Sequence, residues 1–152
     1  MTTLQFASEA QEATYYKVKE YLEASTLFQD AMRVVPEEVR IDIIHETRVV
    51  RVEVLPWQVN PWDKGSELAI VRASSRLTID GNIDTRLMHH LLRENARMRF
   101  GAFQLDDNNE VVFSDTVLGG SNMDLFEMQT CILAVATVAV TYDSIIDESR
   151  VP

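Results

Sequence analysis

The sequence has few of the residues that cross-link a small fold or hold a cofactor. Its 152 residues include one cysteine, Cys131, so an intrachain disulfide is excluded. Cys131 lies in an apolar stretch, which predicts a buried structural thiol and not a nucleophile. The five glycines form no phosphate-binding loop and no nucleophile elbow. A chain of this length needs neither a disulfide nor a metal, because it can bury roughly 70% of its unfolded surface.

The three histidines do not indicate a metal site. His89 and His90 are adjacent in a helical segment, where side chains diverge by about 100°, so they cannot converge on one ion. His45 has no second histidine at the spacing of a metalloprotease helix. The acidic stretch 106–110 lacks the central glycine and the final glutamate of a calcium loop. We therefore expect no catalytic residue, no cofactor and no metal, and we predict that the chain is not an enzyme.

Positively charged residues are fewer than negatively charged ones, and the net charge differs along the chain. The net charge is −10, and from Asp106 onward nine acids stand against Arg150 alone. Such a surface repels phosphates and anionic lipids, so no nucleic-acid partner is expected. The longest apolar run, 131–140, is shorter than a membrane span, and the N-terminus carries no signal pattern. These features predict a cytoplasmic protein without membrane insertion.

Hydrophobic periodicity predicts one α+β domain over residues 1–152, without repeats or linkers. Helices are expected from a capping box at Ser8 to about Ala24, over 83–98, and from a second capping box at Ser121 and Asp124 to the region of Tyr142. Strands are expected at 39–44, 49–55, 68–79, 100–105 and 111–118. The segment 39–44 also follows a good helix start at Pro36, and we choose strand. The result is an antiparallel sheet of about five strands with helices packed on it, in the order α-β-β-β-α-β-β-α.

Turn residues punctuate this pattern. Asp80-Gly81-Asn82 predicts a turn before the second helix, and the stretch 106–109 predicts a hairpin turn. Gly101 lies inside an expected strand, where glycine is unfavourable unless another element approaches closely. We expect a side chain at Gly101 to collide with the first or last helix.

The segment 56–65 places two tryptophans and two prolines in an expected loop between strands. Proline restricts the conformation of such a loop, and tryptophan is a favoured anchor in protein interfaces. Trp57 and Trp62 are therefore candidate partner-binding residues. Alternatively, both rings fold over the core as a lid, and the sequence leaves these two possibilities open.

The last helix carries apolar residues on more than one face. One face has the spacing of a helix that packs on a sheet. Phe126, Leu133, Val138 and Val140 lie away from that face and need a second cover, either the first helix or another copy of the chain. Soluble monomers rarely expose an apolar patch of this size, so we predict a homodimer with these four residues at its interface.

An ordered set of short motifs occupies the stretch from Leu91 to Asp147. It comprises Leu91-Leu92-Arg93-Glu94-Asn95, Phe100-Gly101-Ala102-Phe103-Gln104-Leu105-Asp106, Val111-Val112-Phe113, Leu118-Gly119 and Met123-Asp124, followed by a helix ending in Tyr142-Asp143. This stretch resembles the YbjN group and the CesT-type type III secretion chaperones, particularly a cyanobacterial branch. The resemblance implies an α-β-β-β-α-β-β-α sandwich, dimeric in the chaperones, without catalytic residues. It also implies protein binding, because the chaperones hold a partly unfolded segment of an effector.

The sequence thus predicts a non-catalytic protein- or peptide-binding module, chaperone-like or regulatory, that forms a homodimer. The alternative is a small-molecule-sensing regulatory domain, which would need a concave apolar pocket with a few convergent polar groups. No motif identifies the partner.

Overall fold

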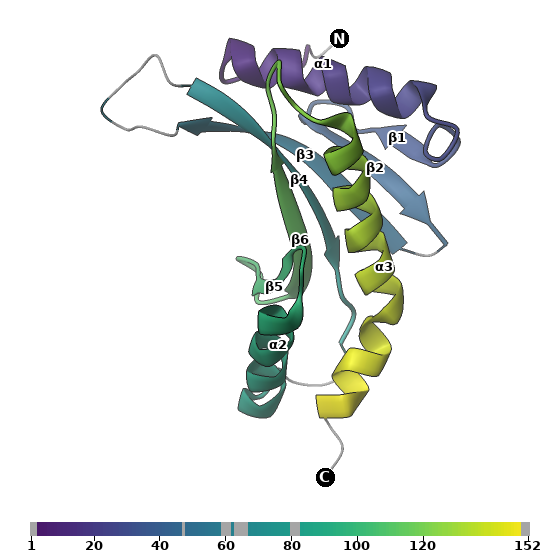
Figure 1. Cartoon of the computed structure of the whole chain (residues 1–152), viewed down its shortest axis with the longest axis vertical. Helices are drawn as coiled ribbons and strands as arrows, with labels where there is room; N and C mark the ends of the chain where they lie inside the picture. Colours follow the sequence, from purple (N-terminus) through teal and green to yellow (C-terminus); the bar gives the residue numbers. More distant parts are fainter. Residues whose placement is uncertain (1–2, 47, 59–61, 63–66, 80–82, 150–152) are drawn as a thin grey trace.

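The chain folds into an α+β structure in which three helices pack on a six-stranded antiparallel sheet (Figure 1). The computed structural model describes residues 3–46, 48–58, 62, 67–79 and 83–149. Neighbouring strands of the sheet follow the order β1-β2-β3-β4-β6-β5. The strands are β1 (Met32–Val34), β2 (Arg40–His45), β3 (Arg48–Gln58), β4 (Glu67–Arg76), β5 (Ala102–Leu105) and β6 (Val111–Leu118). The expected fold class is confirmed, and the ambiguous segment 39–44 forms strand β2.

The sheet has one strand more than the sequence predicts. The additional strand, β1, has three residues and pairs antiparallel with β2, Met32 lying opposite Ile43. Three residues are too few to show a period of two, so the pattern could not reveal it. The element order is therefore α-β-β-β-β-α-β-β-α.

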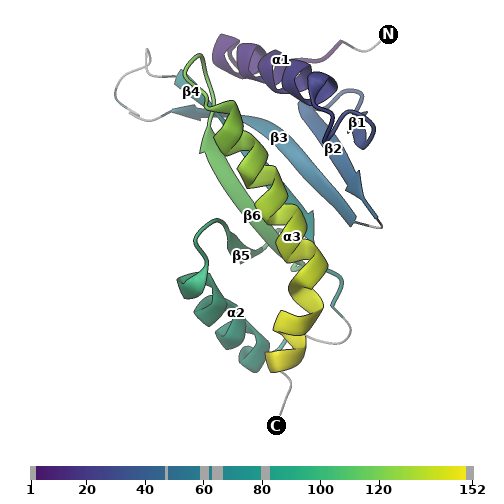
Figure 2. The same cartoon turned by 45° about the vertical axis from the view of Figure 1, so that its right-hand side comes forward.

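Two of the helices cover the same face of the sheet. Helix α1 (Glu9–Ala24) lies across one end and contacts β3 and β4, whereas α3 (Leu125–Ser149) runs along β3, β4 and β6 (Figure 2). Helix α2 (Thr85–Arg97) contacts β5 and α3 near the opposite end. In the described part of the chain, no helix covers the other face of the central strands.

Strand alternation decides which side chains enter the core. Val52 lies opposite Ile41 of β2 and Ala73 of β4, and all three are buried under the helices. Their neighbours in sequence, such as Arg51 and Arg72, point to the opposite face because successive strand residues alternate. One face of the sheet is therefore apolar and the other is charged.

Strand β3 extends beyond the expected boundary at Leu55 into the region predicted to be a loop. Pro56 lies within the strand, opposite Ala69 of β4. The backbone N–H of Val54 donates to Val39 O at 3.1 Å, so the nitrogen of Pro56 points to the same side of β3. Strand β2 has ended at this level, and Pro56 therefore interrupts no hydrogen bond.

The helix starts follow the sequence in one case and differ from it in another. Ser8 caps α1, its Oγ accepting from Gln11 N at 3.1 Å. The expected start of α3 at Ser121 is wrong, because Asp124 is the capping residue. Its Oδ1 accepts from the backbone N–H groups of Phe126 and Glu127 at 2.9 and 3.2 Å.

The loop before α3 is held against α1. Thr14 Oγ1 accepts from Gly120 N at 3.0 Å, and Lys17 Nζ lies 3.2 Å from Ser121 O and 3.4 Å from Met123 O. Lys17 thus donates to backbone carbonyl groups of the loop before α3, which are not paired within a sheet. These contacts fix α1 relative to the start of α3.

The expected hairpin at 106–109 is confirmed. Asp106 N donates to Glu110 O at 3.0 Å, and Asn109 adopts a positive φ of 59°. Asp106 Oδ1 also accepts from the backbone N–H groups of Asn108 and Glu110, each at 2.9 Å. The other predicted turn, Asp80-Gly81-Asn82, lies outside the described residues.

Gly101 precedes β5 and does not lie inside it. It has a φ of +79°, and a Cβ atom there would lie 2.6 Å from Ser114 O and 2.7 Å from the ring of Phe113. The close approach is confirmed, but the neighbour is strand β6 and not the first or last helix.

Helix α3 contains an 18-residue stretch, Leu125–Tyr142, that is long and apolar enough to cross a membrane by length and composition. The run 131–140 considered in the sequence is only part of it. One third of this stretch, 33%, is buried inside the protein, because the sheet-facing side packs on the core. A core helix of a soluble protein has the same composition.

Candidate partner-binding surfaces

The face of the sheet without helices is hollowed into a groove of about 940 Å³. Residues from all six strands and from the β5–β6 turn line it. The charged residues among them are Arg33, Arg40, Arg48, Arg51, Arg72 and Arg76, with Asp42, Glu53, Asp106 and Asp107. We refer to this surface as the arginine groove. Among the residues that the structure describes, no histidine or cysteine lines it.

Ion pairs within the sheet occupy two of these arginines. Arg40 lies 2.7 Å from Glu38 and 3.1 Å from Asp42, which is itself buried. A buried carboxylate requires such a partner, because an unpaired charge away from water is costly. Arg40 and Asp42 are therefore engaged with each other and are not free to bind a ligand.

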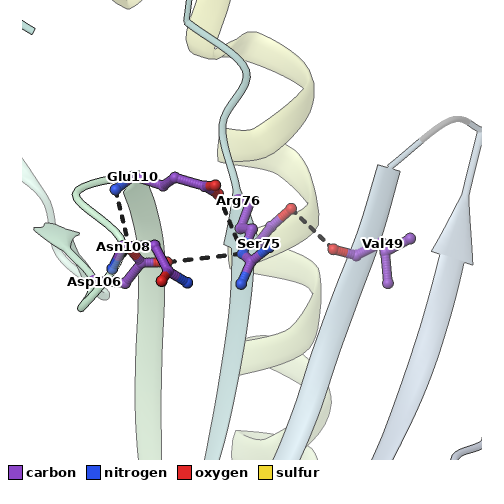
Figure 3. A network of polar contacts seen from close by, with 6 residues as sticks. All are labelled: Val49, Ser75, Arg76, Asp106, Asn108 and Glu110. Carbon is purple, nitrogen blue, oxygen red and sulfur yellow. Dashed lines mark hydrogen bonds and ion pairs between the residues drawn. The ribbon is translucent and has the colours of Figure 1, made fainter.

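Arg76 joins β4 to the hairpin turn at the edge of the groove (Figure 3). Its Nε lies 3.7 Å from Asp106 and 3.4 Å from Glu110. The neighbouring Ser75 points to the helix side, and its Oγ donates to Val49 O at 3.0 Å. This network fixes the wall of the groove next to the β5–β6 turn.

A third arginine is held by an aromatic ring. The guanidinium carbon of Arg48 lies 4.1 Å from the ring centroid of Tyr142, within cation–π range. The Tyr142 hydroxyl donates to Thr78 O at 2.9 Å. The end of α3 thereby closes one end of the groove.

The centre of the groove has a floor of small residues and two arginines without carboxylate partners. Ser74 and Ser114 are buried and lie opposite each other on β4 and β6. Arg51 lies opposite Ser74, and Arg72 lies opposite Glu53. Within the described residues, neither Arg51 nor Arg72 has a carboxylate within ion-pair distance.

Trp57, the first of the two tryptophans predicted to bind a partner, is the penultimate residue of β3. The β3–β4 pair projects from the sheet at this end (Figure 1). Trp57 is 43% exposed, and Trp62 in the connection between the strands is 90% exposed. Trp57 also lines a small hollow of about 230 Å³ with Ala7 and Ser8. Neither ring is buried in the core, which leaves both surfaces accessible to a partner.

The four residues predicted for a dimer interface do not share one environment. Phe126, Leu133 and Val140 are exposed by 72%, 37% and 42%, whereas Val138 is half-buried and packs against the core. The three exposed residues are seven positions apart, so they form a single line along α3 with a drift of about 20° per step. We refer to these three as the α3 stripe.

Cys131 is buried, as the sequence predicts. Burial and the neighbouring carboxylate of Asp115 raise the pKa of its thiol to about 12. At neutral pH the group is a protonated thiol with little nucleophilic character. In the described part of the chain, no group of three or more His, Cys, Asp or Glu residues could hold a metal ion.

Sequence reasoning missed the arginine groove. The signal was present in the strands, where every second residue is polar or charged, as in Arg51-Val52-Glu53 and Arg72-Ala73-Ser74. Alternation predicts an exposed face but not which strands are neighbours. The convergence of Arg51 and Arg72 depends on β3 pairing with β4, which is a tertiary result.

Comparison of the chain with protein-family models, with curated proteins and with solved structures gives no match. The resemblance of residues 91–147 to the YbjN and secretion chaperone groups therefore stays a prediction.

Proposed function

We propose that this chain is a non-catalytic protein- or peptide-binding module of the chaperone-like class, cytoplasmic and homodimeric. The exposure of Trp57, near the end of β3, and of Trp62, in the connection to β4, carries the proposal. Large aromatic rings in water are costly unless a partner covers them, and tryptophan is the residue most enriched among interface hot spots.

The resemblance to the YbjN and CesT-type groups supports this function. Its implied element order differs from the observed order by the short strand β1 alone. The composition of the arginine groove also favours a protein partner over a small apolar ligand. Its walls are mainly charged, whereas a small-molecule sensor needs mainly apolar walls around a few polar groups.

A second copy of the chain is the proposed occupant of the α3 stripe. Two stripes can pack against each other symmetrically, since residues at heptad spacing interdigitate between helices. The stripe lies on the helix-covered side of the sheet, so pairing there leaves the arginine groove open. The net charge of −10 opposes association, and added salt should strengthen the dimer modestly by screening.

Sedimentation tests the dimer. The wild type should sediment at twice the chain mass of 17.3 kDa at micromolar concentration, and Leu133→Glu should sediment as a monomer. Leu118→Glu provides the control, because Leu118 is an exposed apolar residue on the opposite face of the sheet. A wild type that stays at 17.3 kDa at every salt concentration would contradict the dimer.

Affinity capture tests protein binding. The wild type, the double variant Trp57→Ala/Trp62→Ala and the control Leu92→Ala are immobilised and exposed to native lysate. Leu92 is an exposed apolar residue of α2, so Leu92→Ala also removes exposed apolar surface, but away from the tryptophans. Quantitative mass spectrometry should find proteins retained by the wild type and by the control at equal levels, and reduced at least tenfold on the tryptophan variant.

The folded state of each variant is checked by its melting temperature. Exposed tryptophans contribute little to stability, so the double variant should melt within a few degrees of the wild type. Equal retention of every protein by all three forms, with folding intact, would refute the tryptophan surface as a binding site.

A further inference from the structure

The arginine groove gathers arginines on a protein that is strongly negative. Six arginines and four acids line it, and two of the arginines also pair with Glu38 and Glu110 just outside the lining, so the local charge is close to balanced (6 − 6 = 0), whereas the whole chain carries −10. Six of the chain's 14 lysines and arginines therefore line this groove, five of them on the face of the sheet away from the helices and Arg48 at its end beside Tyr142. This concentration of arginines is a property of the fold, since the residues come from β1, β2, β3 and β4.

Internal ion pairs do not account for the two central arginines. Arg40 and Arg76 pair with carboxylates of the chain, and Arg48 stacks on Tyr142. Arg51 and Arg72 lie between these groups, half-buried, with no ion pair to any described residue. Glu53 lies opposite Arg72 and two residues from Arg51, and it reduces the repulsion between the two guanidinium groups without forming an ion pair with either. Both guanidinium groups therefore keep donors for the carboxylates of a ligand.

The register sets their spacing. Arg51 lies opposite Ser74, and Arg72 is two residues earlier on the same strand, so the pair is diagonal across β3 and β4. Diagonal residues of an antiparallel pair are roughly 7–8 Å apart at the backbone. Each guanidinium presents a planar fork of donors that matches a carboxylate. The short side chains of Ser74 and Ser114 line the groove between the arginines.

The dimensions of the groove fit an extended segment. Its lining spans all six strands, which at about 4.8 Å per strand is roughly 24 Å across. An extended chain of about seven residues covers that distance at about 3.3 Å per residue. Val49, Leu105 and Val112 provide apolar wall between the charged groups, suited to alternating acidic and apolar side chains.

Resting on the protein-binding function proposed above, we propose that the arginine groove binds an extended acidic segment of a partner protein, with carboxylates on Arg51 and Arg72. Spaced carboxylates fit this surface better than a nucleic-acid backbone does. Glu53 and Asp107 stand among the arginines, and a continuous line of phosphates would lie against them. A peptide can place its carboxylates on the arginines and leave neutral residues opposite Glu53 and Asp107.

Fluorescence polarisation tests the proposal with three labelled probes. The first is the heptapeptide Glu-Leu-Glu-Val-Glu-Leu-Glu, the second carries glutamine at each glutamate, and the third is a 12-nucleotide poly(A) RNA. At 50 mM salt the acidic peptide should bind at least tenfold more tightly than the glutamine peptide. Its affinity should also fall severalfold at 300 mM salt.

Matched variants locate the site. Arg51→Gln/Arg72→Gln should weaken binding of the acidic peptide at least tenfold, whereas Arg93→Gln/Arg99→Gln, with the same change of net charge, should leave it within twofold. The control arginines lie on and after α2, and neither lines the groove. Thr116→Glu provides a second variant, since Thr116 is exposed and lies directly opposite Arg72. A carboxylate there would pair with Arg72 inside the fold, so peptide binding should fall at least tenfold while the melting temperature is kept.

Several results would overturn the proposal. These are equal binding of the acidic and glutamine peptides, tighter binding of the RNA, absence of peptide binding up to 1 mM, or equal loss in the two double-arginine variants. The capture experiment on the tryptophans distinguishes the two proposals. Partners lost from the tryptophan variant but retained by Arg51→Gln/Arg72→Gln would leave the protein-binding function standing and remove the groove from it.

Discussion

The side chain of Asn95 pairs with both backbone groups of Phe103. Its Nδ2 donates to Phe103 O at 3.1 Å, and its Oδ1 accepts from Phe103 N at 2.7 Å. The amide thus replaces a neighbouring strand at the outer edge of β5. It connects the end of α2 to the sheet, and both residues belong to the motifs that carry the family resemblance.

Asn95→Asp should destabilise the fold by about 1–3 kcal/mol, because a carboxylate oxygen would face Phe103 O without a proton to share. Asn95→Ala should cost a similar amount, since both backbone groups of Phe103 lose their partner. Urea denaturation measures the difference. Asn108→Ala is the control, because Asn108 is exposed and donates only through its backbone. Equal midpoints for Asn95→Ala and the control would show that the pairing contributes nothing.

The two glycines with positive φ separate backbone strain from steric collision. Gly101 and Gly120 have φ values of +79° and +93°, but only at Gly101 would a Cβ atom meet other atoms, at 2.6 Å from Ser114 O. Gly120→Ala should cost about 1 kcal/mol from the backbone alone. Gly101→Ala should cost roughly 1–3 kcal/mol more, because β6 must shift. Thermal unfolding measures the loss of stability in each variant. Equal losses would contradict the close contact between Gly101 and β6.

The start of α3 can be assigned by two single substitutions. Asp124→Ala should cost about 1 kcal/mol, because the N–H groups of Phe126 and Glu127 lose their acceptor and the helix dipole loses a negative charge. Ser121→Ala should have almost no effect, since its side chain does not cap the helix. Chemical denaturation at neutral pH measures both. A larger effect at Ser121 would favour the start that the sequence predicts.

Because the thiol of Cys131 is buried, we expect the free energy of unfolding to fall as the pH becomes alkaline. The pKa of its thiol rises from 9.0 to about 12 on folding, with burial the main cause and Asp115 the second. Above pH 9 the unfolded chain releases this proton and the folded chain does not. The contribution of the protonated thiol to the free energy of unfolding is therefore complete below pH 9. It falls by about 1.4 kcal/mol per pH unit as the pH rises towards 12.

Cys131→Ala should remove that part of the alkaline slope. Between pH 8 and 10 the wild type should lose about 1 kcal/mol more stability than the variant, as measured by urea denaturation. Burial also raises the pKa of Tyr15, but this residue is present in both proteins and its effect cancels in the difference. Parallel stability curves for the two proteins would contradict the raised thiol pKa.

Local sequence patterns were sufficient for most of the elements. The alternation of Val50, Val52 and Val54 predicts strand β3 and its buried face, and Ser8 with Gln11 predicts the start of α1. These predictions succeed because they depend on periodicity and on hydrogen bonds within four residues. The start of α3 was missed because Ser121 and Asp124 both satisfy the same local pattern.

The α+β class, the buried thiol of Cys131 and the close approach at Gly101 could be predicted from the sequence, because each follows from residue type and local spacing. The neighbour at Gly101, the exposure of Trp62 and the position of β1 are visible only in the folded chain. The same holds for the arginine groove, because Arg51 and Arg72 are distant in the sequence and meet only through the pairing of β3 with β4. Alternation along a strand is a local property of the sequence, whereas the order of strands in a sheet depends on long-range packing. The candidate site depends on strand order, so the sequence alone could not reveal it.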